Sequence, residues 1–306
     1  MPDVHEYATV RYETLDGDDA GIARIVMNRP DARNAQNIQM TYDLNEAFDR
    51  AAGDDGVKVI IVSGEGPHFS AGHDLRDRGK FSEHEAVGTW CGFELPGHEG
   101  FMAREEEIYL GMCRRWRNIP KPTIAQIHGR TIAGGLMIAW VCDLIIASDD
   151  ATFVDPVVSM GVNGVEWFAH PWELGARKAK EFLFTADTWT AQEGHRLGMV
   201  NHVVPRAELV DFTLTLARKI AAKPSFALKL TKESVNQTID NMGQTTAMNA
   251  TFSMHQIAHA HNKAVFGVYV DPSGVQVPPK PSVPVSASSA DPATPAAATA
   301  TAATKE

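Results

Sequence analysis

The segment Val59-Ile-Ile-Val-Ser-Gly-Glu-Gly-Pro-His-Phe-Ser-Ala-Gly-His-Asp-Leu75 decides the fold class of this chain. It opens with an apolar, β-branched run, which is typical of a buried strand, and continues into a loop rich in glycine. A second segment repeats the arrangement, because a strand-like run over Thr123 to His128 leads into Gly129-Arg-Thr-Ile-Ala-Gly-Gly135. Each loop follows a predicted strand and precedes a predicted helix, so the two loops are the first candidates for a functional site.

Further strand-like runs cover Ile22 to Met27 and Asp143 to Ser148, and they alternate with segments of helical period. One such segment, between the first two strands, places five apolar residues on one helix face. They are Met40, Leu44, Ala47, Phe48 and Ala51. This alternation predicts an α/β fold. From Glu208 onward the chain reads mainly as helix, with a break at Pro224 and an end near Phe266.

Small residues in the two loops would let a ligand come close to the backbone. A helix that begins at Gly134 would also point its free N–H groups and its positive dipole end at that ligand. Two backbone donors from separate loops that converge on one oxygen make an oxyanion hole. Neither loop matches a phosphate-binding motif, since no Lys-Ser/Thr pair follows Gly135 and there is no G-x-G-x-x-G pattern.

Composition limits the class of protein. The chain has 306 residues, a formal net charge of −10 and three cysteines that form no CxxC pair. The acidic balance argues against a nucleic-acid partner, and no apolar run is long enough to cross a membrane. The expectation is therefore a cytoplasmic protein without a membrane segment. Residues 271–306 lack aromatic residues, Leu and Ile and hold 7 of the 17 prolines, which predicts a disordered tail.

Four segments occur in order along the chain, at residues 27–35, 59–75, 127–135 and 142–147, and a further stretch covers 191–200. Their order and spacing closely resemble those of the crotonase superfamily, also known as the enoyl-CoA hydratase/isomerase family. The resemblance implies a crotonase-like α/β fold of repeated ββα units, with a C-terminal helical region that builds homotrimers or dimers of trimers. It also implies an acyl-CoA thioester substrate, with no cofactor or metal besides the coenzyme A of that substrate. The expected divisions are a core over residues 1–206, a helical region over 207–270 and the tail.

Carried over residue by residue, the resemblance places the two oxyanion-hole amides of the family on Ala71 and Gly134. Arg33 and the backbone around Ala32 match positions near the coenzyme A phosphates. Two neighbours of the expected amides complete the predicted binding set. They are Asp74 and Gly135.

The chain departs from the family at the two glutamates that activate water in the hydratases, because Met137 and Val157 stand at those positions. Neither side chain can transfer a proton. Glu166 and His73 are the candidate replacements, although a carboxylate at a helix start and a structural histidine are the plain alternatives. The reaction is therefore nominally hydration, with isomerisation, decarboxylation or thioester hydrolysis through Glu166 or His73 as alternatives. A non-catalytic acyl-CoA-binding oligomer is a further alternative.

Three histidines and one serine outside the predicted site have plainer structural interpretations. His255 and His259 have the helical spacing of a zinc pair, but no glutamate follows the first histidine and no acidic residue is near in sequence. A polar helix face or a subunit contact is the interpretation. Ser70 beside His73 does not predict a nucleophile and base, because residues three apart on a loop rarely reach that geometry. His170 is a weaker candidate for the site.

Other polar and aromatic clusters also have ordinary interpretations. The run Glu105-Glu-Glu107, at the start of a helix predicted over Arg104 to Asn118, favours a solvated helix face. Thr190-Ala-Gln-Glu193 is a capping box, closed by a glycine after the helix. Some aromatic residues could line an acyl pocket, although filling the core is their more usual role. They are Trp167, Phe168 and Trp172, with Trp90 and Phe93 as a possible cap.

Overall fold

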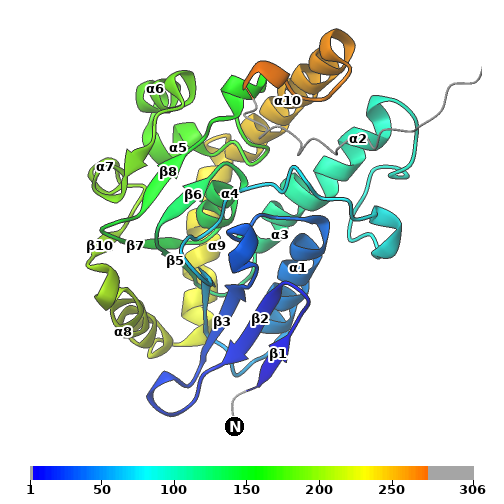
Figure 1. Ribbon diagram of the computed structural model, residues 1–306. Helices are drawn as coiled ribbons and strands as arrows, with labels where there is room; N and C mark the ends of the chain where they lie inside the picture. The colour runs from blue at the N-terminus through cyan, green and yellow to red at the C-terminus, as the bar shows by residue number, and fades with distance from the viewer. Residues whose placement is uncertain (1–2, 275–306) are drawn as a thin grey trace, which may run out of the picture. The chain divides into compact units, whose positions relative to one another are not determined.

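A computed structural model describes residues 3–274 (Figure 1). Within these residues, seven strands form the main sheet, in the order β1-β2-β3-β4-β5-β7-β10. Strands β1 to β3 are antiparallel, and the pairs from β3 to β10 are parallel. The bounds are β1 Val4–Glu6, β2 Val10–Thr14, β3 Ile22–Met27, β4 Val59–Gly64, β5 Thr123–Ile127, β7 Leu144–Ser148 and β10 His202–Val204.

A smaller sheet of three strands lies beside the main one in the described residues. It pairs β6 (Arg130–Ile132) in parallel with β8 (Thr152–Val154), and β8 in antiparallel fashion with β9 (Trp189–Thr190). The small sheet therefore joins the loop after β5 to a segment about twenty residues later. As a result, α4 (Gly134–Trp140) begins at a fixed place next to the loop after β4.

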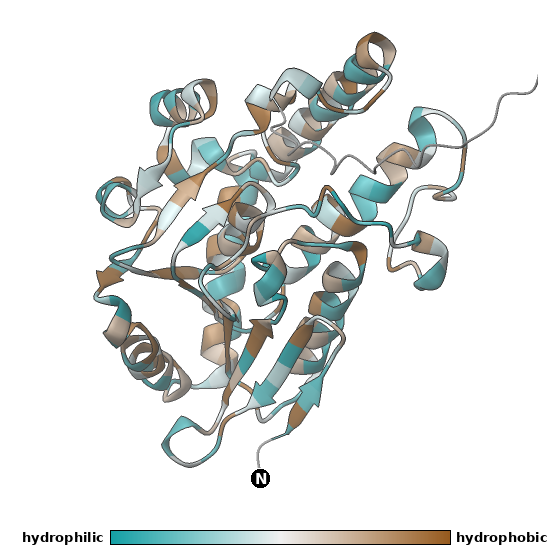
Figure 2. Ribbon diagram, viewed as in Figure 1, coloured by the Kyte–Doolittle hydropathy of each residue, from teal (hydrophilic) through white to brown (hydrophobic). Residues whose placement is uncertain are grey.

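The central strands are buried on both faces, which explains why they are nearly continuous apolar runs. Ile60 and Val62 of β4 point to the face that carries α1 (Ile38–Gly53) and α3 (Met112–Arg117). Ile61 points to the opposite face, where it packs with α8 (Leu209–Ala221). Figure 1 shows α8 on one side of the sheet and α1 and α3 on the other. The strands of the sheet carry many of the most hydrophobic residues in Figure 2.

The remaining helices surround the small sheet and one end of the main sheet (Figure 1). A π-helical stretch, η4, continues α2 directly into α3, so that these three segments form one bent rod. Such π stretches are uncommon and often occur at functional sites. The bounds are α2 His98–Glu105, η4 Glu106–Gly111, α5 His170–Leu174, α6 Ala176–Thr185, α7 Ala191–Leu197, α9 Ser225–Asn241 and α10 Gln244–Phe266.

The structure confirms the predicted α/β class and the four predicted strands to within two residues. It also confirms the helical break at Pro224, which precedes the first residue of α9, and the helix end at Phe266. The helices of residues 207–270 do not all stand apart from the core, since α8 covers one face of the main sheet through Leu209 and Ala217. In residues 3–274, no helix is both long and apolar enough to cross a membrane.

The first four residues of the predicted tail, 271–274, are ordered in the structure. The amide of Asp271 donates to the carbonyl of Met160 at 2.8 Å, and Pro272–Gly274 form a short helical turn, η7. The rest of the predicted disordered tail, residues 275–306, lies outside the described part of the chain.

One of the two hydrogen bonds of the predicted capping box of α7 is present. The hydroxyl oxygen of Thr190 accepts from the amide of Glu193 at 3.2 Å, and Gly198 ends the helix in the left-handed conformation with φ 91°. The Glu193 carboxylate, however, pairs with Arg196 at 2.7 Å rather than closing the box.

Candidate active site

A cavity of about 660 Å³ opens between the loop after β4, the rod of α2 and η4, the segment before α5, and α10. Several titratable side chains line it, although they come from distant parts of the sequence. These are His73, Asp74, Glu105, Glu166, His255 and His259. Apolar neighbours such as Val157 and Ile108 complete the wall. An enclosed apolar cavity with a few converging polar groups is the usual form of a small-molecule site.

The loop after β4 leaves one backbone amide free, and it is not the predicted one. The Ala71 amide donates to the carbonyl of Arg33 at 2.9 Å, and the Asp74 amide donates to that of Gln36 at 2.9 Å. Of the two amides between them, that of Gly72 donates to the hydroxyl of Ser70 at 3.2 Å. Across residues 3–274, no acceptor lies within hydrogen-bond reach of the His73 amide. The predicted role of Ala71 as an oxyanion donor is therefore wrong, and His73 supplies the available N–H of this loop.

Asn34 explains why the loop keeps this shape. Its buried side chain donates to the carbonyl oxygens of Glu65 at 2.9 Å and His68 at 3.0 Å, and it accepts from the amide of Arg29 at 2.9 Å. The Ser70 hydroxyl donates to the carbonyl of Asn34 at 2.8 Å. Because that hydroxyl is committed to the backbone, Ser70 does not form a nucleophile and base with the nearby imidazole, as the sequence analysis concluded.

The second loop brings Gly134 to the same place. Ala133, just before α4, has φ 45° and ψ −112°, a strained conformation for a residue with a Cβ. Its amide donates to Val154 of β8 at 2.9 Å, which holds the turn. In the described part of the chain the Gly134 amide has no acceptor, as expected at the first turn of a helix. A Cβ added at Gly134 would overlap the ring of His73, so the two loops are in contact there.

The predicted binding residues divide into two groups. Gly135 packs on Ser70, where an added Cβ would lie 2.9 Å from the serine carbonyl oxygen, and it does not line the cavity. Asp74 does line the cavity, and its carboxylate pairs with Arg29 at 3.0 Å. The remaining two residues form a turn that adjoins the loop after β4 without lining the cavity. They are Ala32, which is half-buried, and Arg33, which is exposed.

His73 contributes a side chain to the cavity as well as an amide. Its ring stacks on Tyr109 of η4, with 3.7 Å between ring centroids and 12° between planes. Its Nε2 lies 3.7 Å from Oε2 of Glu166. Burial lowers the pKa of His73 to about 4, so the imidazole is neutral at neutral pH.

Glu166 faces the cavity from the segment between β8 and α5. Its side chain is only 3% exposed, and in the described residues its Oε2 has no hydrogen-bond donor. Burial, reinforced by the charge of Glu105, raises the pKa of Glu166 well above its usual range. The alternative of a carboxylate at a helix start does not apply, because α5 begins only at His170.

The glutamate run of the rod is buried, so the predicted solvated helix face is wrong. Glu106 pairs with Arg114 at 2.9 Å, and the carboxylate of Glu107 accepts from the amides of Val87 and Gly88 at 2.6 and 2.9 Å. The loop of residues 87–88 folds back over this side of the rod, and no local pattern in the sequence indicates that contact.

Glu105 has a different environment, because it meets the two histidines of α10. Its Oε1 lies 3.4 Å from Nε2 of His259, and its Oε2 lies 3.6 Å from Nε2 of His255. Gln256 also donates to Glu105 Oε2, at 2.7 Å. Burial raises the pKa of Glu105 to about 8 and lowers that of His255 to about 3. The interpretation of His255 and His259 as a polar helix face is therefore wrong, because both are buried and face the carboxyl of Glu105.

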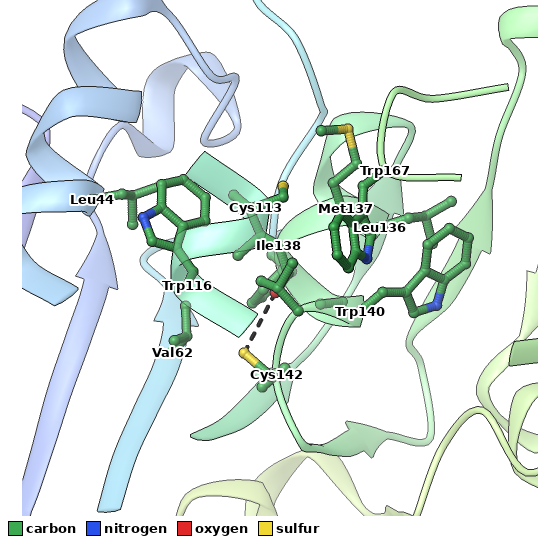
Figure 3. Close-up of a cluster of buried hydrophobic side chains, with 14 of the residues drawn as sticks. Leu44, Val62, Cys113, Trp116, Leu136, Met137, Ile138, Trp140, Cys142 and Trp167 are labelled. Atoms are coloured by element: carbon green, nitrogen blue, oxygen red, sulfur yellow. Dashed lines mark hydrogen bonds between the residues drawn. The ribbon is translucent and has the colours of Figure 1, made fainter. Parts of the chain in front are cut away.

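The two residues that the sequence resemblance aligns with the hydratase glutamates differ in their surroundings. Met137 belongs to a buried apolar cluster that also contains Trp167 and Trp140 (Figure 3). Val157 lines the cavity. No carboxylate at either position is available for catalysis, so any proton transfer must come from other residues.

The remaining candidates lie away from the cavity. His170 is fully buried, and its Nε2 lies 2.8 Å from Asp155. Trp167 fills the core instead of lining the cavity, while Trp90 is 62% exposed and does not cover it. Phe93 packs on Phe81, which does line the cavity, at 4.9 Å between ring centroids.

Three comparisons with known proteins agree with this geometry. The model of the enoyl-CoA hydratase/isomerase family matches residues 17–271. A Mycobacterium tuberculosis protein named "putative enoyl-CoA hydratase EchA13" is 46% identical over 269 residues, which cover 86% of this chain and 84% of that protein. The 4-chlorobenzoyl coenzyme A dehalogenase-2 of Arthrobacter sp. is 32% identical over 252 residues, covering 80% and 87% of the two chains.

Among solved structures, a probable enoyl-CoA hydratase from Mycobacterium smegmatis superimposes with a TM-score of 0.77 at 46% identity. The match covers 86% of this chain and 99% of that one. The crotonase-like fold expected from the sequence is therefore confirmed.

Proposed function

The chain belongs to the enoyl-CoA hydratase/isomerase family, and on that basis we propose that it binds an acyl-CoA thioester in the cavity and moves a proton beside the thioester carbonyl. The free amides of His73 and Gly134 would hold the carbonyl oxygen, where negative charge develops in an enolate. Glu166 would accept and return the proton. The buried position of Glu166 beside His73 is the observation that carries this proposal.

The reaction that needs the fewest groups is double-bond isomerisation of an enoyl-CoA. Glu166 takes the proton from C2 of a 3-enoyl thioester, and the electron pair moves into the carbonyl to give a dienolate. The same carboxyl then delivers the proton to C4, which shifts the double bond to C2–C3. One carboxyl suffices for both steps, which suits a site with Met137 and Val157 at the hydratase positions.

Hydration is the second candidate, because the cavity contains another carboxyl. Glu105 and Glu166 each place an oxygen 3.6 Å from Nε2 of His255, so the two flank one point of the cavity wall. A water held there would have an acid and a base at hand, although neither occupies the position of a hydratase glutamate. The product separates the two reactions, since hydration yields a 3-hydroxyacyl-CoA and isomerisation keeps the mass of the substrate.

The turn of Ala32 and Arg33 is the proposed binding site for the phosphates of coenzyme A. The exposed Arg33 and the turn around Ala32 adjoin the loop after β4, which suits the phosphates of the coenzyme A of the substrate. The proton transfer itself requires no other cofactor.

Helices α9 and α10 expose apolar side chains, which supports a homotrimer or a dimer of trimers. These include Phe226, Leu230, Val235, Met254 and Ile257. The free thiols of all three cysteines suit a reducing, cytoplasmic environment.

Replacement of Glu166 by Gln tests the proposal. We expect turnover of enoyl-CoA substrates to fall by about 10²- to 10⁴-fold, because the amide cannot transfer the proton. Affinity for a saturated acyl-CoA, measured by calorimetry, should change little. Glu173→Gln is the matched control, since Glu173 lies nearby in sequence but lines a different cavity. Full turnover in Glu166→Gln would refute the assigned role. If the parent bound acyl-CoA but turned over no thioester of any class, a non-catalytic binding protein would be indicated instead.

A further inference from the structure

One cluster in the cavity is not used by the proposed reaction. His255 and His259 lie one turn apart on α10, and their Nε2 atoms are 2.9 Å apart. Both side chains are less than a tenth exposed, and both face the carboxyl of Glu105. All three groups line the cavity, so ions can reach them from the same opening as the substrate.

The hydrogen bonds of the outer ring nitrogens fix the form of both imidazoles. Nδ1 of His255 lies 2.8 Å from the carbonyl of Gly164, and Nδ1 of His259 lies 2.5 Å from that of Tyr269. A carbonyl can only accept, so each Nδ1 carries the hydrogen of its ring. A neutral imidazole has one such hydrogen. Both Nε2 atoms therefore point a lone pair at each other, which is favourable only if a positive ion or an extra proton lies between them.

The distances from Glu105 to the two rings bear on the metal-bound alternative. A carboxylate that accepts a hydrogen bond from an imidazolium would lie about 2.7–2.9 Å away. Its oxygens instead lie 3.4 Å from Nε2 of His259 and 3.6 Å from Nε2 of His255. Ligands of a tetrahedral zinc ion, with bonds of about 2.0–2.1 Å, are separated by roughly 3.3–3.4 Å. The spacing of the carboxylate thus suits ligands that share a metal ion, and the two Nε2 atoms, which are 2.9 Å apart, would separate by about 0.4 Å to bind it with tetrahedral angles.

The surroundings of the cluster also resemble those of a metal site. Metal-binding histidines usually donate their other N–H to a carbonyl or carboxylate, which orients the ring, and both rings do so here. Gln256 likewise donates to the Glu105 carboxylate at 2.7 Å and fixes its position. Two imidazoles and one carboxylate are a ligand set for Zn²⁺ and similar transition metals rather than for Mg²⁺ or Ca²⁺.

We propose that Glu105, His255 and His259 bind one divalent transition metal ion, Zn²⁺ in the first place, in the wall of the acyl cavity. The fourth position of the ion would face Glu166, whose Oε1 lies 3.6 Å from Nε2 of His255. The sequence does not reveal this site, because the acidic ligand comes from α2, 150 residues before the first histidine. The proposal goes beyond the proposed function, since metal binding requires no turnover.

Titration of the tag-free full chain with Co²⁺ and Zn²⁺ tests the site. We expect one ion per chain by equilibrium dialysis, and intense visible absorption from Co²⁺ in a tetrahedral field. The variants Glu105→Gln and His259→Ala should each lower the affinity for Zn²⁺ by at least about 100-fold, since loss of a ligand exceeds loss of an outer-shell partner. His261→Ala is the matched control, because His261 is exposed on the same helix and lies outside the cluster.

The wild-type chain alone can overturn the proposal, so it does not depend on whether the buried variants fold. An absence of bound Zn²⁺ and Co²⁺ at saturating concentrations would show that an extra proton occupies the space between the rings. Binding that is lost in His261→Ala but kept in Glu105→Gln would place the ion elsewhere and would also overturn the site. A change in the Co²⁺ spectrum on addition of an acyl-CoA would support its position in the cavity. Loss of turnover in Glu166→Gln bears only on the proposed reaction.

Discussion

The two sides of the cavity are built in different ways. On the loop side, the functional groups are the backbone amides of His73, which lines the cavity, and of Gly134, which contacts the His73 ring without lining the cavity itself. On the helix side, they are buried side chains from α2, the segment before α5, and α10. Backbone donors tolerate many side chains but need small residues and tight turns. Buried titratable groups tolerate neither removal nor isolation, because each depends on its partners.

The largest effect is expected on the loop side, from Gly134→Val. The added side chain would overlap the His73 ring and lie close to Gln36, at the place where the two loops touch. We expect turnover to fall by at least about 10²- to 10³-fold, the loss typical of one oxyanion donor, as measured with enoyl-CoA substrates. Gly53→Val is the matched control, because nothing lies within 4 Å of a Cβ added there. Equal activity in the two variants would show that the Gly134 amide does not face the substrate.

Asn34→Ala should impair the loop side of the cavity, and with it stability and turnover, while Zn²⁺ binding on the helix side stays unchanged. The change removes the donor to the carbonyls of Glu65, His68 and Phe69, of which the bond to Phe69 is buried, and an unsatisfied buried group costs about 1–3 kcal/mol. We expect the free energy of unfolding, measured with a chemical denaturant, to fall by about 2–4 kcal/mol, together with a loss of turnover. Zn²⁺ affinity should not change, since Asn34 does not touch the helix side.

The exposed Asn241, at the end of α9, provides the control for Asn34. Its replacement by Ala should leave stability and turnover close to the wild-type values. A fall in Zn²⁺ affinity in Asn34→Ala would show that the two sides of the cavity are coupled, and the division between them would then be wrong.

The same difference explains how much the sequence could predict. The loop side could largely be predicted from the sequence, because glycines after strand-like runs and a helix start at Gly134 are local patterns. The error at Ala71 was one of register within a few residues, and hydrogen bonds to Arg33, Ser70 and Gln36 decide which amide is free. No local pattern in the sequence specifies those partners.

The partners of the buried side chains on the helix side could not be predicted from the sequence, because tertiary packing alone determines them. Glu105 and Glu106 are neighbours in a run that looks like a solvated helix start, yet both are buried and they have separate partners. Only tertiary packing joins Glu105 to His255, and the π-helical stretch after Glu105 changes which residues face the cavity. The spacing of His255 and His259 was a real signal, but its interpretation required an acidic residue that lies far away in the sequence.

The smallest effect is expected from Thr190→Ala, which lies outside both sides of the cavity. The substitution removes the acceptor for the Glu193 amide at the start of α7 and should lower the free energy of unfolding by about 0.5–2 kcal/mol. Because α7 contributes no residue to the cavity, turnover and Zn²⁺ affinity should both stay at the wild-type level when measured below the melting temperature. A loss of either at this position would mean that general loosening of the fold is enough to impair the site. In that case the losses expected for Gly134→Val and Asn34→Ala could not be attributed to the loops, whereas an unaffected Thr190→Ala makes a local origin the direct explanation.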